Sequence, residues 1–434
     1  MTILDATVVN VVIPAFQHQF DASTAQVQWI ISCYALALGL TTPLAGALAG
    51  YLGNRRVYLL SLGVFTAASL LCGLAPSLPL LIAGRCLQGA AGGLTLPLGM
   101  ARLFAAFPPG RRGQALGVFG VVLVFAPTIG PLVGGAFADA QLDNWIFFVN
   151  VPIGAIGVVL GKRYLARDMV EDRRYGPVPV ISLLLTCTGF GGVLTGASLL
   201  GIASAPRRIV ILAFVVGGIS LSGLIIRELR SSNPLLKITL YRVPTYRLGS
   251  ALNTVGQVIV FGVQFIIPIS FQTVGGFSAF EAGLALVPMA ITSGLTGLLA
   301  GRICDRIGPR LPLVVGFALL TAGVALLTRH ITNPSYIGII GPMILAGAGS
   351  GAIPPIVPVA AMHGLERSEL ADATSLLQAV QRLSQALAVA VLATLLARAS
   401  PVSGLQQAYL ITLMAGTLCV VLACALPGWP GRRS

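Results

Sequence analysis

The residues best suited to chemistry are a few polar side chains set in long apolar stretches. Asp5 lies within the first apolar run, ILDATVVNVVIPAF, and no other acidic residue falls well inside a predicted membrane span. A carboxylate in hydrocarbon costs at least about 2.5 kcal/mol, so it is kept where a cavity, a partner or a proton path uses it. We interpret Asp5 as a residue that binds and releases protons; the alternative is a residue at the membrane interface.

A second polar group lies on the fourth apolar stretch. Arg85 and Gln88 share one helix face with two small residues, Gly89 and Gly92. An unpaired guanidinium at this depth is expensive, so we expect Arg85 to pair with a carboxylate or with carbonyls across a cavity. Opposite an acid, Arg85 could switch the proton affinity of that acid. The alternative is a static hydrogen-bond clamp between helices.

A polar stripe crosses the thirteenth apolar stretch. It is formed by Ser375, Gln378, Arg382 and Gln385. Polar side chains inside a membrane either contact a substrate or join neighbouring helices, and the spacing leaves both interpretations open.

The elements that carry these residues are predicted to be membrane-spanning helices. The chain is 56% hydrophobic and only 9% charged, whereas soluble domains carry roughly 25% charged residues. Fourteen apolar stretches are expected, most near the ~20 residues that a helix needs to cross a bilayer. They cover roughly 3–17, 25–49, 57–75, 78–103, 113–138, 145–161, 178–201, 208–227, 247–274, 281–302, 310–328, 335–361, 370–398 and 406–428. The predicted class is an all-α integral membrane protein.

Basic residues predict how the chain is oriented. Alternate loops hold 20 lysines and arginines on one side of the predicted membrane and four on the other. Cytoplasmic loops carry the excess of positive charge in membrane proteins. We therefore expect a multi-pass protein of the plasma (inner) membrane with both termini in the cytoplasm.

An internal repeat divides the chain. GALAGYLGNRR (46–56) and GLLAGRICDRIGPR (297–310) both join a glycine-rich helix end to a glycine turn and basic residues. Parallel repeats of this kind are typical of transporters. We expect six-helix bundles at 1–161 and 247–428, with an extra helix pair at 178–227.

The two repeated segments form a predicted cytoplasmic gate. Asp305 is placed to bond the N-terminus of a nearby helix and hold one conformation closed. The alternative is a simple topology anchor. The gate residues are Gly46, Gly53, Arg55, Asp305, Arg306, Gly308 and Arg310.

Other classes of function lack the residues that they need. The 27 basic residues mark loops rather than a nucleic-acid surface, and no G-x-x-x-x-G-K-[ST] loop is present for ATP. The seven cysteines and three histidines form no short metal-ligand pair. No paired catalytic groups fall inside the spans, so we expect no enzyme, no metal and no cofactor, with an ion gradient as energy source.

Seven motifs, in order along nearly the whole chain, resemble the fourteen-span drug/proton antiporters of the major facilitator superfamily, the EmrB/QacA type. The first-helix motif LDATVVNVVIP (4–14) contains Asp5 and Asn10. The others are Trp29 with Tyr34, Arg85 with Gln88 and Gly89, GPLVGG (130–135), WIFFVNVPIG (145–154), NPLLKITLYR (233–242) and PISFQTVGGFSAFEAGLALVP (268–288).

The resemblance implies a major facilitator fold and proton-coupled export of small hydrophobic or drug-like compounds by alternating access. It implies that protons bind at Asp5 and Arg85 and that a monomer acts in the lipid bilayer. The substrate-cavity candidates are Asn10, Trp29, Tyr34, Gln88, Gln272, Gln378 and Arg382. Gly130, Pro131, Gly134 and Gly135 carry the antiporter motif, whose small residues and proline allow a bent, closely packed helix. The alternatives are a specific metabolite or natural-product exporter, a symporter, or a non-transporting membrane sensor.

Two departures from the family pattern stand out. Gly50 occupies the position where the family has an acid in the first gate segment, which puts that half of the gate in question. The first helix is also short, with only MTIL before Asp5, and we expect the true start to lie upstream.

Overall fold

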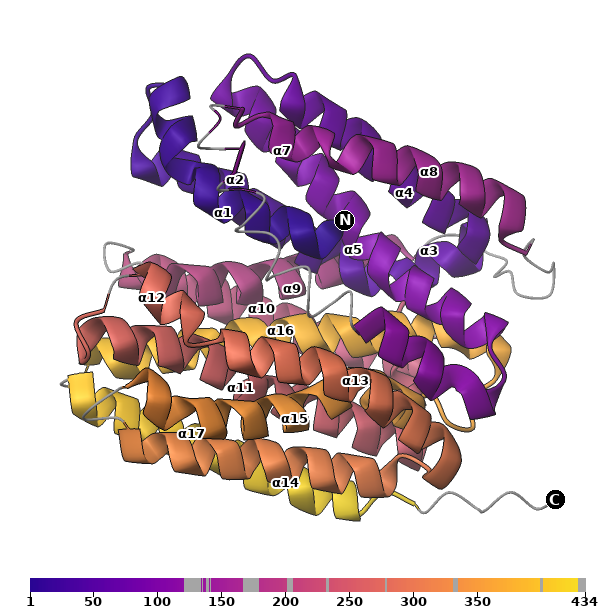
Figure 1. The fold of residues 1–434 in the computed structure, drawn as a ribbon. Helices are drawn as coiled ribbons and strands as arrows, with labels where there is room; N and C mark the ends of the chain where they lie inside the picture. The colour runs from indigo at the N-terminus through magenta and orange to yellow at the C-terminus, as the bar shows by residue number, and fades with distance from the viewer. Residues whose placement is uncertain are drawn as a thin grey trace.

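The computed structural model describes residues 1–434 except 121–133, 135, 138–139, 141, 167–178, 201–205, 232–233, 278, 331–334, 399–400 and 428–434. Every element in the described residues is a helix (Figure 1). An all-helical chain satisfies each backbone hydrogen bond within its own segment, as the interior of a bilayer requires.

The helices of the first half are α1 (Thr2–Gln19), α2 (Thr24–Thr41), η1 (Thr42–Leu44), α3 (Ala45–Leu52), α4 (Asn54–Gly73), α5 (Leu78–Ala106), η2 (Pro109–Arg111), α7 (Trp145–Phe148) and α8 (Asn150–Tyr164). Residues 112–120 are also helical. The extra pair is α9 (Val180–Leu200) and α10 (Arg207–Arg230).

The helices of the second half are η4 (Ile238–Arg242), α11 (Pro244–Thr273), α12 (Ala279–Leu284), α13 (Val287–Ile307), α14 (Arg310–Leu327), η5 (Thr328–His330), α15 (Tyr336–Ala361), η6 (Arg367–Glu369), α16 (Leu370–Arg398) and α17 (Pro401–Cys424).

Eleven helices within the described ranges are long and apolar enough to cross a membrane. Helices α1 and α5, which carry Asp5 and Arg85, are not among these eleven, and the helix that begins at residue 112 runs into the undescribed segment. The class of multi-pass helical membrane protein is therefore confirmed, whereas the count of fourteen spans stays a prediction.

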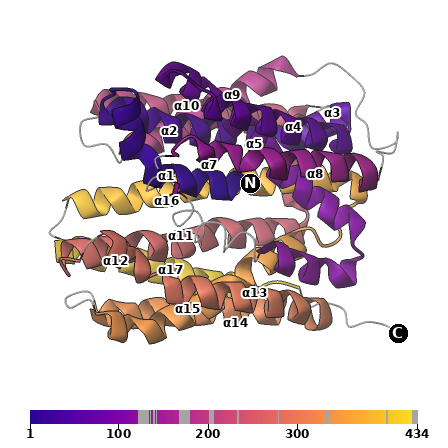
Figure 2. The same cartoon turned by 45° about the horizontal axis from the view of Figure 1, so that its top comes forward.

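The helices form two groups that lie against each other (Figures 1 and 2). Helices α1 to α8 form one group and α11 to α17 the other; these groups are called the N-half and the C-half below. Helix α9 packs against α2 of the N-half and α16 of the C-half, and α10 packs on α9. The extra pair therefore lies beside both halves.

Glycines end the two repeated helices in the same way. Gly53 follows α3 with φ of 90° and Gly308 follows α13 with φ of 86°. Residues with a side chain rarely adopt this backbone conformation, so glycine at both positions makes the turn possible. The helix in the first half continues through Gly50 to Leu52, three residues beyond the end expected at 49, because Gly53 terminates it.

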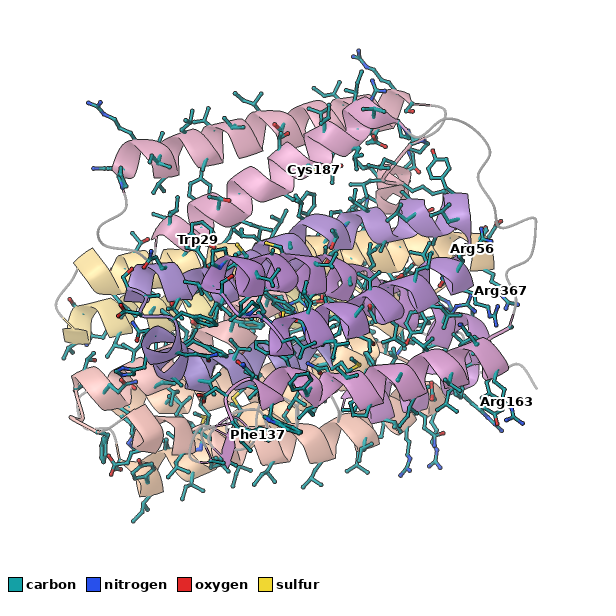
Figure 3. All side chains as sticks on the ribbon, turned by 90° about the horizontal axis from the view of Figure 1, so that it is seen from above. Trp29, Arg56, Phe137, Arg163, Cys187 and Arg367 are labelled. Carbon is teal, nitrogen blue, oxygen red and sulfur yellow. The ribbon has the colours of Figure 1, made fainter. Side chains whose placement is uncertain are left out.

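The basic loop residues gather at one end of the molecule. Figure 3 has Arg56, Arg163 and Arg367 at the same end, with Trp29 toward the other. These arginines come from three of the loops counted as positive in the sequence. This end is called the cytoplasmic end below; which side of the membrane it faces stays a prediction.

Candidate functional site

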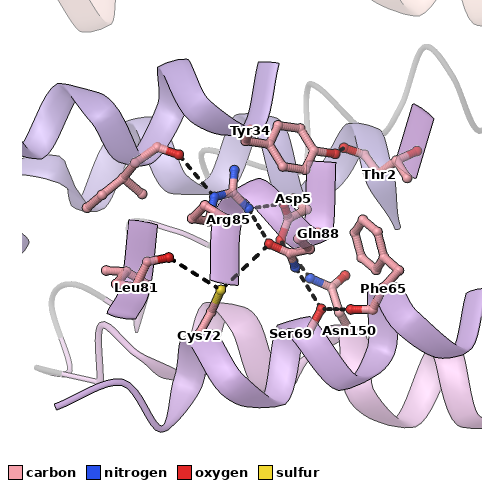
Figure 4. A network of polar contacts seen from close by, with 11 residues as sticks. Thr2, Asp5, Tyr34, Phe65, Ser69, Cys72, Leu81, Arg85, Gln88 and Asn150 are labelled. Carbon is pink, nitrogen blue, oxygen red and sulfur yellow. Dashed lines mark hydrogen bonds and ion pairs between the residues drawn. The ribbon is translucent and has the colours of Figure 1, made fainter. Parts of the chain in front are cut away.

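The centre of the N-half contains a buried ion pair with its hydrogen-bond partners (Figure 4). Asp5 of α1 is 3% exposed and Arg85 of α5 is 1% exposed. The Arg85 guanidinium donates from Nη1 to Asp5 Oδ2 and, at 2.6 Å, to Gln88 Oε1. Its Nε donates to the backbone carbonyl of Ile30 on α2 at 3.2 Å. The expected pairing of Arg85 with a carboxylate and a carbonyl is therefore present.

Two amides complete the surroundings of the Asp5 carboxylate. Gln88 Nε2 donates to Asp5 Oδ1 at 3.1 Å, and Asn150 Nδ2 of α8 donates to the same oxygen at 2.8 Å. Gln88 also donates to Ser69 Oγ of α4 at 2.7 Å. Each of these groups is a donor, so the buried Asp5 side chain has hydrogen-bond partners on both oxygens.

Tyr34 forms one wall of this site. Its ring lies under the Arg85 guanidinium, with 4.1 Å between the Cζ atom and the ring centre, a cation–π contact. The Tyr34 hydroxyl donates to the Thr2 carbonyl at 2.8 Å. The contact fixes the start of α1, and therefore Asp5, against α2.

Glycines on α5 allow the close approach that builds the site. A Cβ atom at Gly89 would lie 2.3 Å from the Tyr34 carbonyl oxygen, and one at Gly93 would lie 2.4 Å from that of Leu38. Small residues four apart let two helix backbones touch, and here they bring α2 onto α5. Gly89, which the sequence placed on the face of Arg85, thus has a packing role.

Two members of the network were not predicted. Asn150 lies within the motif WIFFVNVPIG, so a polar residue in an apolar run was a usable signal. Ser69 had none, because serines are common in membrane helices. The Asn150 Oδ1 atom is buried and has no hydrogen-bond partner among the described residues, which leaves an acceptor beside Asp5.

The other substrate-cavity candidates are spread over the molecule. Gln378 is buried where α16 meets α5, with its Nε2 3.4 Å from Met100 Sδ. Trp29 is 51% exposed, and Gln272 is exposed and donates to the Pro268 carbonyl of its own helix. The structure does not bring these last two together with Asp5. The side chain of Asn10 lies outside the described residues.

Arg382 lies on α16 in a second polar group, in the C-half. Its Nη1 donates to Gln385 Oε1 at 3.4 Å, and Gln385 Nε2 donates to Gln257 Oε1 of α11 at 3.0 Å. The charge of Arg382 also interacts with the Tyr34 phenol. Tyr34, whose ring packs on Arg85, is therefore near both central guanidinium groups.

The cytoplasmic ends of the halves meet at Asp305, at the end of α13. Its two carboxylate oxygens accept the backbone N–H groups of Gly113 and Gln114, each at 2.8 Å. These N–H groups begin the helix that starts at residue 112, where unpaired donors and the helix dipole favour a negative charge. The expected contact between Asp305 and a helix N-terminus is present.

The same close contact recurs at the other repeat. A Cβ atom at Gly301 would lie 2.1 Å from the Gly113 carbonyl oxygen, and one at Gly46 would lie 2.7 Å from Asp372 Cα at the start of α16. Gly46 precedes Gly50 by four residues, as Gly301 precedes Asp305. In the second-half repeat the acid, Asp305, lies at the end of α13 and faces Gly113. In the first-half repeat Gly50 occupies the helix end, and the acid, Asp372, lies on the facing helix α16.

Asp372 occupies the first turn of α16 and is buried. Its Oδ2 lies 3.5 Å from Nζ of Lys237, in the segment that leads from the extra helix pair into the C-half. Nearby, Ser375 Oγ donates to the carbonyls of Thr42 and Pro43 at 2.8 and 3.0 Å. Both cytoplasmic contacts between the halves are thus closed.

The remaining gate residues lie at the surface of the same end. Arg306 and Arg310 are exposed, and Arg55 donates to the Lys162 carbonyl at 2.6 Å. Of the antiporter motif, Gly130, Pro131 and Gly135 lie outside the described residues, and Gly134 is buried. No group of three metal-ligating side chains occurs in the described part of the chain.

Comparison with known proteins decides the family. A family model described as Major Facilitator Superfamily matches residues 1–389 and 248–428. The chain belongs to the Major Facilitator Superfamily. The multidrug export protein EmrB of Haemophilus influenzae is 30% identical over 389 residues, which cover 88% of this chain and 76% of that protein. The family expected from the motifs is confirmed.

Two further likenesses agree. The methylenomycin A resistance protein of Streptomyces coelicolor is 30% identical over 437 residues, covering 100% of this chain and 91% of that protein. The solved structure of the proton:xylose symporter XylE superposes with a TM-score of 0.69 at 15% identity, over 98% of this chain and 94% of that one, and shares the fold. This facilitator-superfamily protein is a membrane transporter and not an enzyme.

Proposed function

We propose that this transporter exports small, largely apolar compounds across the plasma membrane in exchange for protons. The observation that carries the proposal is the buried Asp5 carboxylate, which the sequence places inside a predicted span and which is held by Arg85, Gln88 and Asn150. Such a site can change its charge in response to protons from one side. The relatives named for multidrug export and methylenomycin A resistance support export as the direction.

Protonation of Asp5 is the coupling step. A proton from outside neutralises the carboxylate and removes the charge that holds Arg85. The new O–H then needs an acceptor, and the unpartnered Asn150 Oδ1 is available beside it. Arg85 keeps its bonds to Ile30 and Gln88, so the hold of α5 on α1 is weakened by loss of the ion pair while α2 stays attached.

The two cytoplasmic contacts form the gate. Asp305 closes one on the helix that starts at residue 112, and Asp372 lies against Gly46 at the other. With both closed, the pathway opens outward, where Asp5 takes up a proton. Rocking of the halves breaks both contacts and turns the site toward the cytoplasm, where Asp5 loses its proton and substrate enters.

Efflux of a lipophilic dye from cells tests this function. The rate is measured in wild type, Asp5→Asn and Asp21→Asn, each with and without a protonophore. Asp21 is an exposed acid with φ of 47°, a conformation that asparagine tolerates, so it is a matched control. We expect efflux to collapse with the protonophore and in Asp5→Asn, and to persist in Asp21→Asn. Protonophore-insensitive efflux, or full activity in Asp5→Asn, would refute proton coupling at Asp5.

The second candidate is export of one compound or compound class by the same mechanism. The relative named for resistance to a single compound, methylenomycin A, favours it. A wild type that moves no dye of a broad panel, yet protects cells against one compound, would decide for this candidate.

A further inference from the structure

Arg382 lies deep within the membrane-spanning part of α16. The helix begins at Leu370 and ends at Arg398, so at 1.5 Å per residue Arg382 lies about 18 Å from one end and about 24 Å from the other. A charged side chain at this depth is rare and is paired or used in function.

Within the part of the chain that the structure describes, Arg382 forms no ion pair with a carboxylate. Apart from Asp5, every aspartate and glutamate of the chain lies near a helix end or between the apolar stretches, and residues 121–133, outside the described part, contain none. Asp5 is held by Arg85. Within the described residues, Arg382 donates a hydrogen bond to the neutral amide of Gln385, which leaves most of its five N–H donors for another acceptor.

The groups around Arg382 are also suited to hold an acceptor. Gln385 and Gln257 join α16 to α11, and Asn253, one turn before Gln257, donates to the Leu377 carbonyl at 3.2 Å. These bonds hold α16 against α11 on both sides of Arg382 along the helix. Helix α16 packs against α2 and α5 of the N-half, and Arg382 is near Tyr34 of α2, so the guanidinium is close to the boundary between the halves.

We propose that Arg382 is an anion-binding subsite of the transport pathway and that the preferred substrates are lipophilic organic acids. This inference rests on the proposed transport function. A planar guanidinium binds a carboxylate or similar oxyanion through two parallel hydrogen bonds, and the apolar helix faces take up the rest of the molecule. Arg382 bonds Gln385 and Arg85 bonds Asp5, so the anion subsite and the proton site are formed by different residues.

Two xanthene dyes of similar size and opposite charge test the inference. Fluorescein carries a carboxylate, and rhodamine 123 is a cation whose carboxyl group is esterified. Binding to the purified transporter is followed by fluorescence anisotropy without any gradient, and efflux is measured in cells. The variants are Arg382→Gln, Arg382→Lys and, as a control, Arg329→Gln in η5 at a helix end.

We expect wild type to prefer fluorescein, and Arg382→Gln to weaken fluorescein binding about tenfold or more while leaving rhodamine 123 unchanged. Arg382→Lys should retain part of the binding because it keeps the charge, and Arg329→Gln should match wild type. A thermal-melting curve checks that each variant is folded.

Other outcomes overturn the inference. Equal loss of both dyes in Arg382→Gln would make the residue a clamp between α16 and α11. Binding of rhodamine 123 without fluorescein would exclude an anion subsite and leave proton-driven export untouched. Because binding needs no gradient, a failure of proton coupling would leave the preference for fluorescein, and its loss in Arg382→Gln, in place.

Discussion

At the scale of single residues, the Asp5–Arg85 pair is the feature on which the rest depends. The two side chains come from helices 80 residues apart and are almost fully buried. Burying a charge is costly unless a partner and hydrogen bonds compensate, and Gln88 and Asn150 supply those bonds. A buried pair of this kind is weak evidence for stability, which agrees with the proposed role in proton coupling.

Removing one partner of the pair should therefore be worse than removing both. We expect Arg85→Gln to destabilise the protein by about 3–5 kcal/mol, because it leaves the Asp5 carboxylate buried without a cation. The double variant Asp5→Asn/Arg85→Gln should regain much of that loss. Thermal unfolding of the four proteins in one detergent measures the coupling. Additive losses would mean that the two charges do not interact.

At the scale of helices, the two gate contacts solve one problem in two ways. The helix that starts at residue 112 receives its negative charge from Asp305 on the opposite helix. Helix α16 carries Asp372 in its own first turn, while Gly50 holds no charge. The departure from the family pattern at Gly50 is thus accompanied by an acid on the facing helix, near Lys237.

Moving the acid from position 372 to position 50 should give the first-half contact the same arrangement as the Asp305 contact of the second half. We expect Asp372→Gly to slow efflux several-fold, because α16 loses the charge at its N-terminus and Lys237 loses its partner. Adding Gly50→Asp should recover much of the rate. Initial rates of dye efflux measure both effects, with wild type as the reference for intact contacts and Asp305→Asn as the reference for loss of the acid at the other contact. A double variant no faster than Asp372→Gly would contradict the equivalence of the two contacts.

Close backbone approach at the gate gives a second test at this scale. We expect Gly46→Ala and Gly301→Ala to slow transport strongly, because the added Cβ would lie 2.7 Å from Asp372 Cα and 2.1 Å from the Gly113 carbonyl. Gly63→Ala on α4 has open space around the new methyl group and is the matched control. Accessibility of a cytoplasmic cysteine to a membrane-impermeant reagent reports the open gate. Equal rates in all three variants would mean that the contacts do not limit closure.

At the scale of the whole molecule, the two halves join at the cytoplasmic end while α9 lies against both. Helix α16 packs on α3, η1 and α5 of the N-half. The extra pair touches α2 and α16, so the proposed rocking of the halves would carry α9 along or slide over it. The contacts at Asp305 and Ser375 hold the halves together at the cytoplasmic end and do not block a space between the halves at the opposite end.

A cross-link across the halves should stop the cycle. We expect Thr42→Cys with Ser375→Cys to form a disulfide under oxidant, because the Ser375 hydroxyl already bonds the Thr42 carbonyl at 2.8 Å. Efflux should fall to background and return after reduction. Each single variant controls for the native cysteines, which are free thiols. Undiminished efflux in the cross-linked protein would exclude rocking at this contact.

The sequence by itself determined that the helices lie in lipid, the class of fold, the family and the two residues at the centre of the N-half, Asp5 and Arg85. Long apolar stretches, loop charges and glycine turns are local features. The first follow from the cost of polar groups in lipid, the second from the positive-inside rule and the third from the positive φ that glycine tolerates. Asp5, Arg85 and Asp305 stood out because a charge inside an apolar run, or at a repeated helix end, is visible without neighbours.

Only the tertiary structure decided which of these residues meet. Asn150 and Ser69 join Asp5 through contacts between distant helices, and spacing along a chain does not encode such contacts. The tertiary structure also separated Trp29 and Gln272 from the central network. It brought Asp372 opposite α3, the helix that contains Gly50. In a membrane these pairings depend on where backbones approach closely, and packing of whole helices determines that.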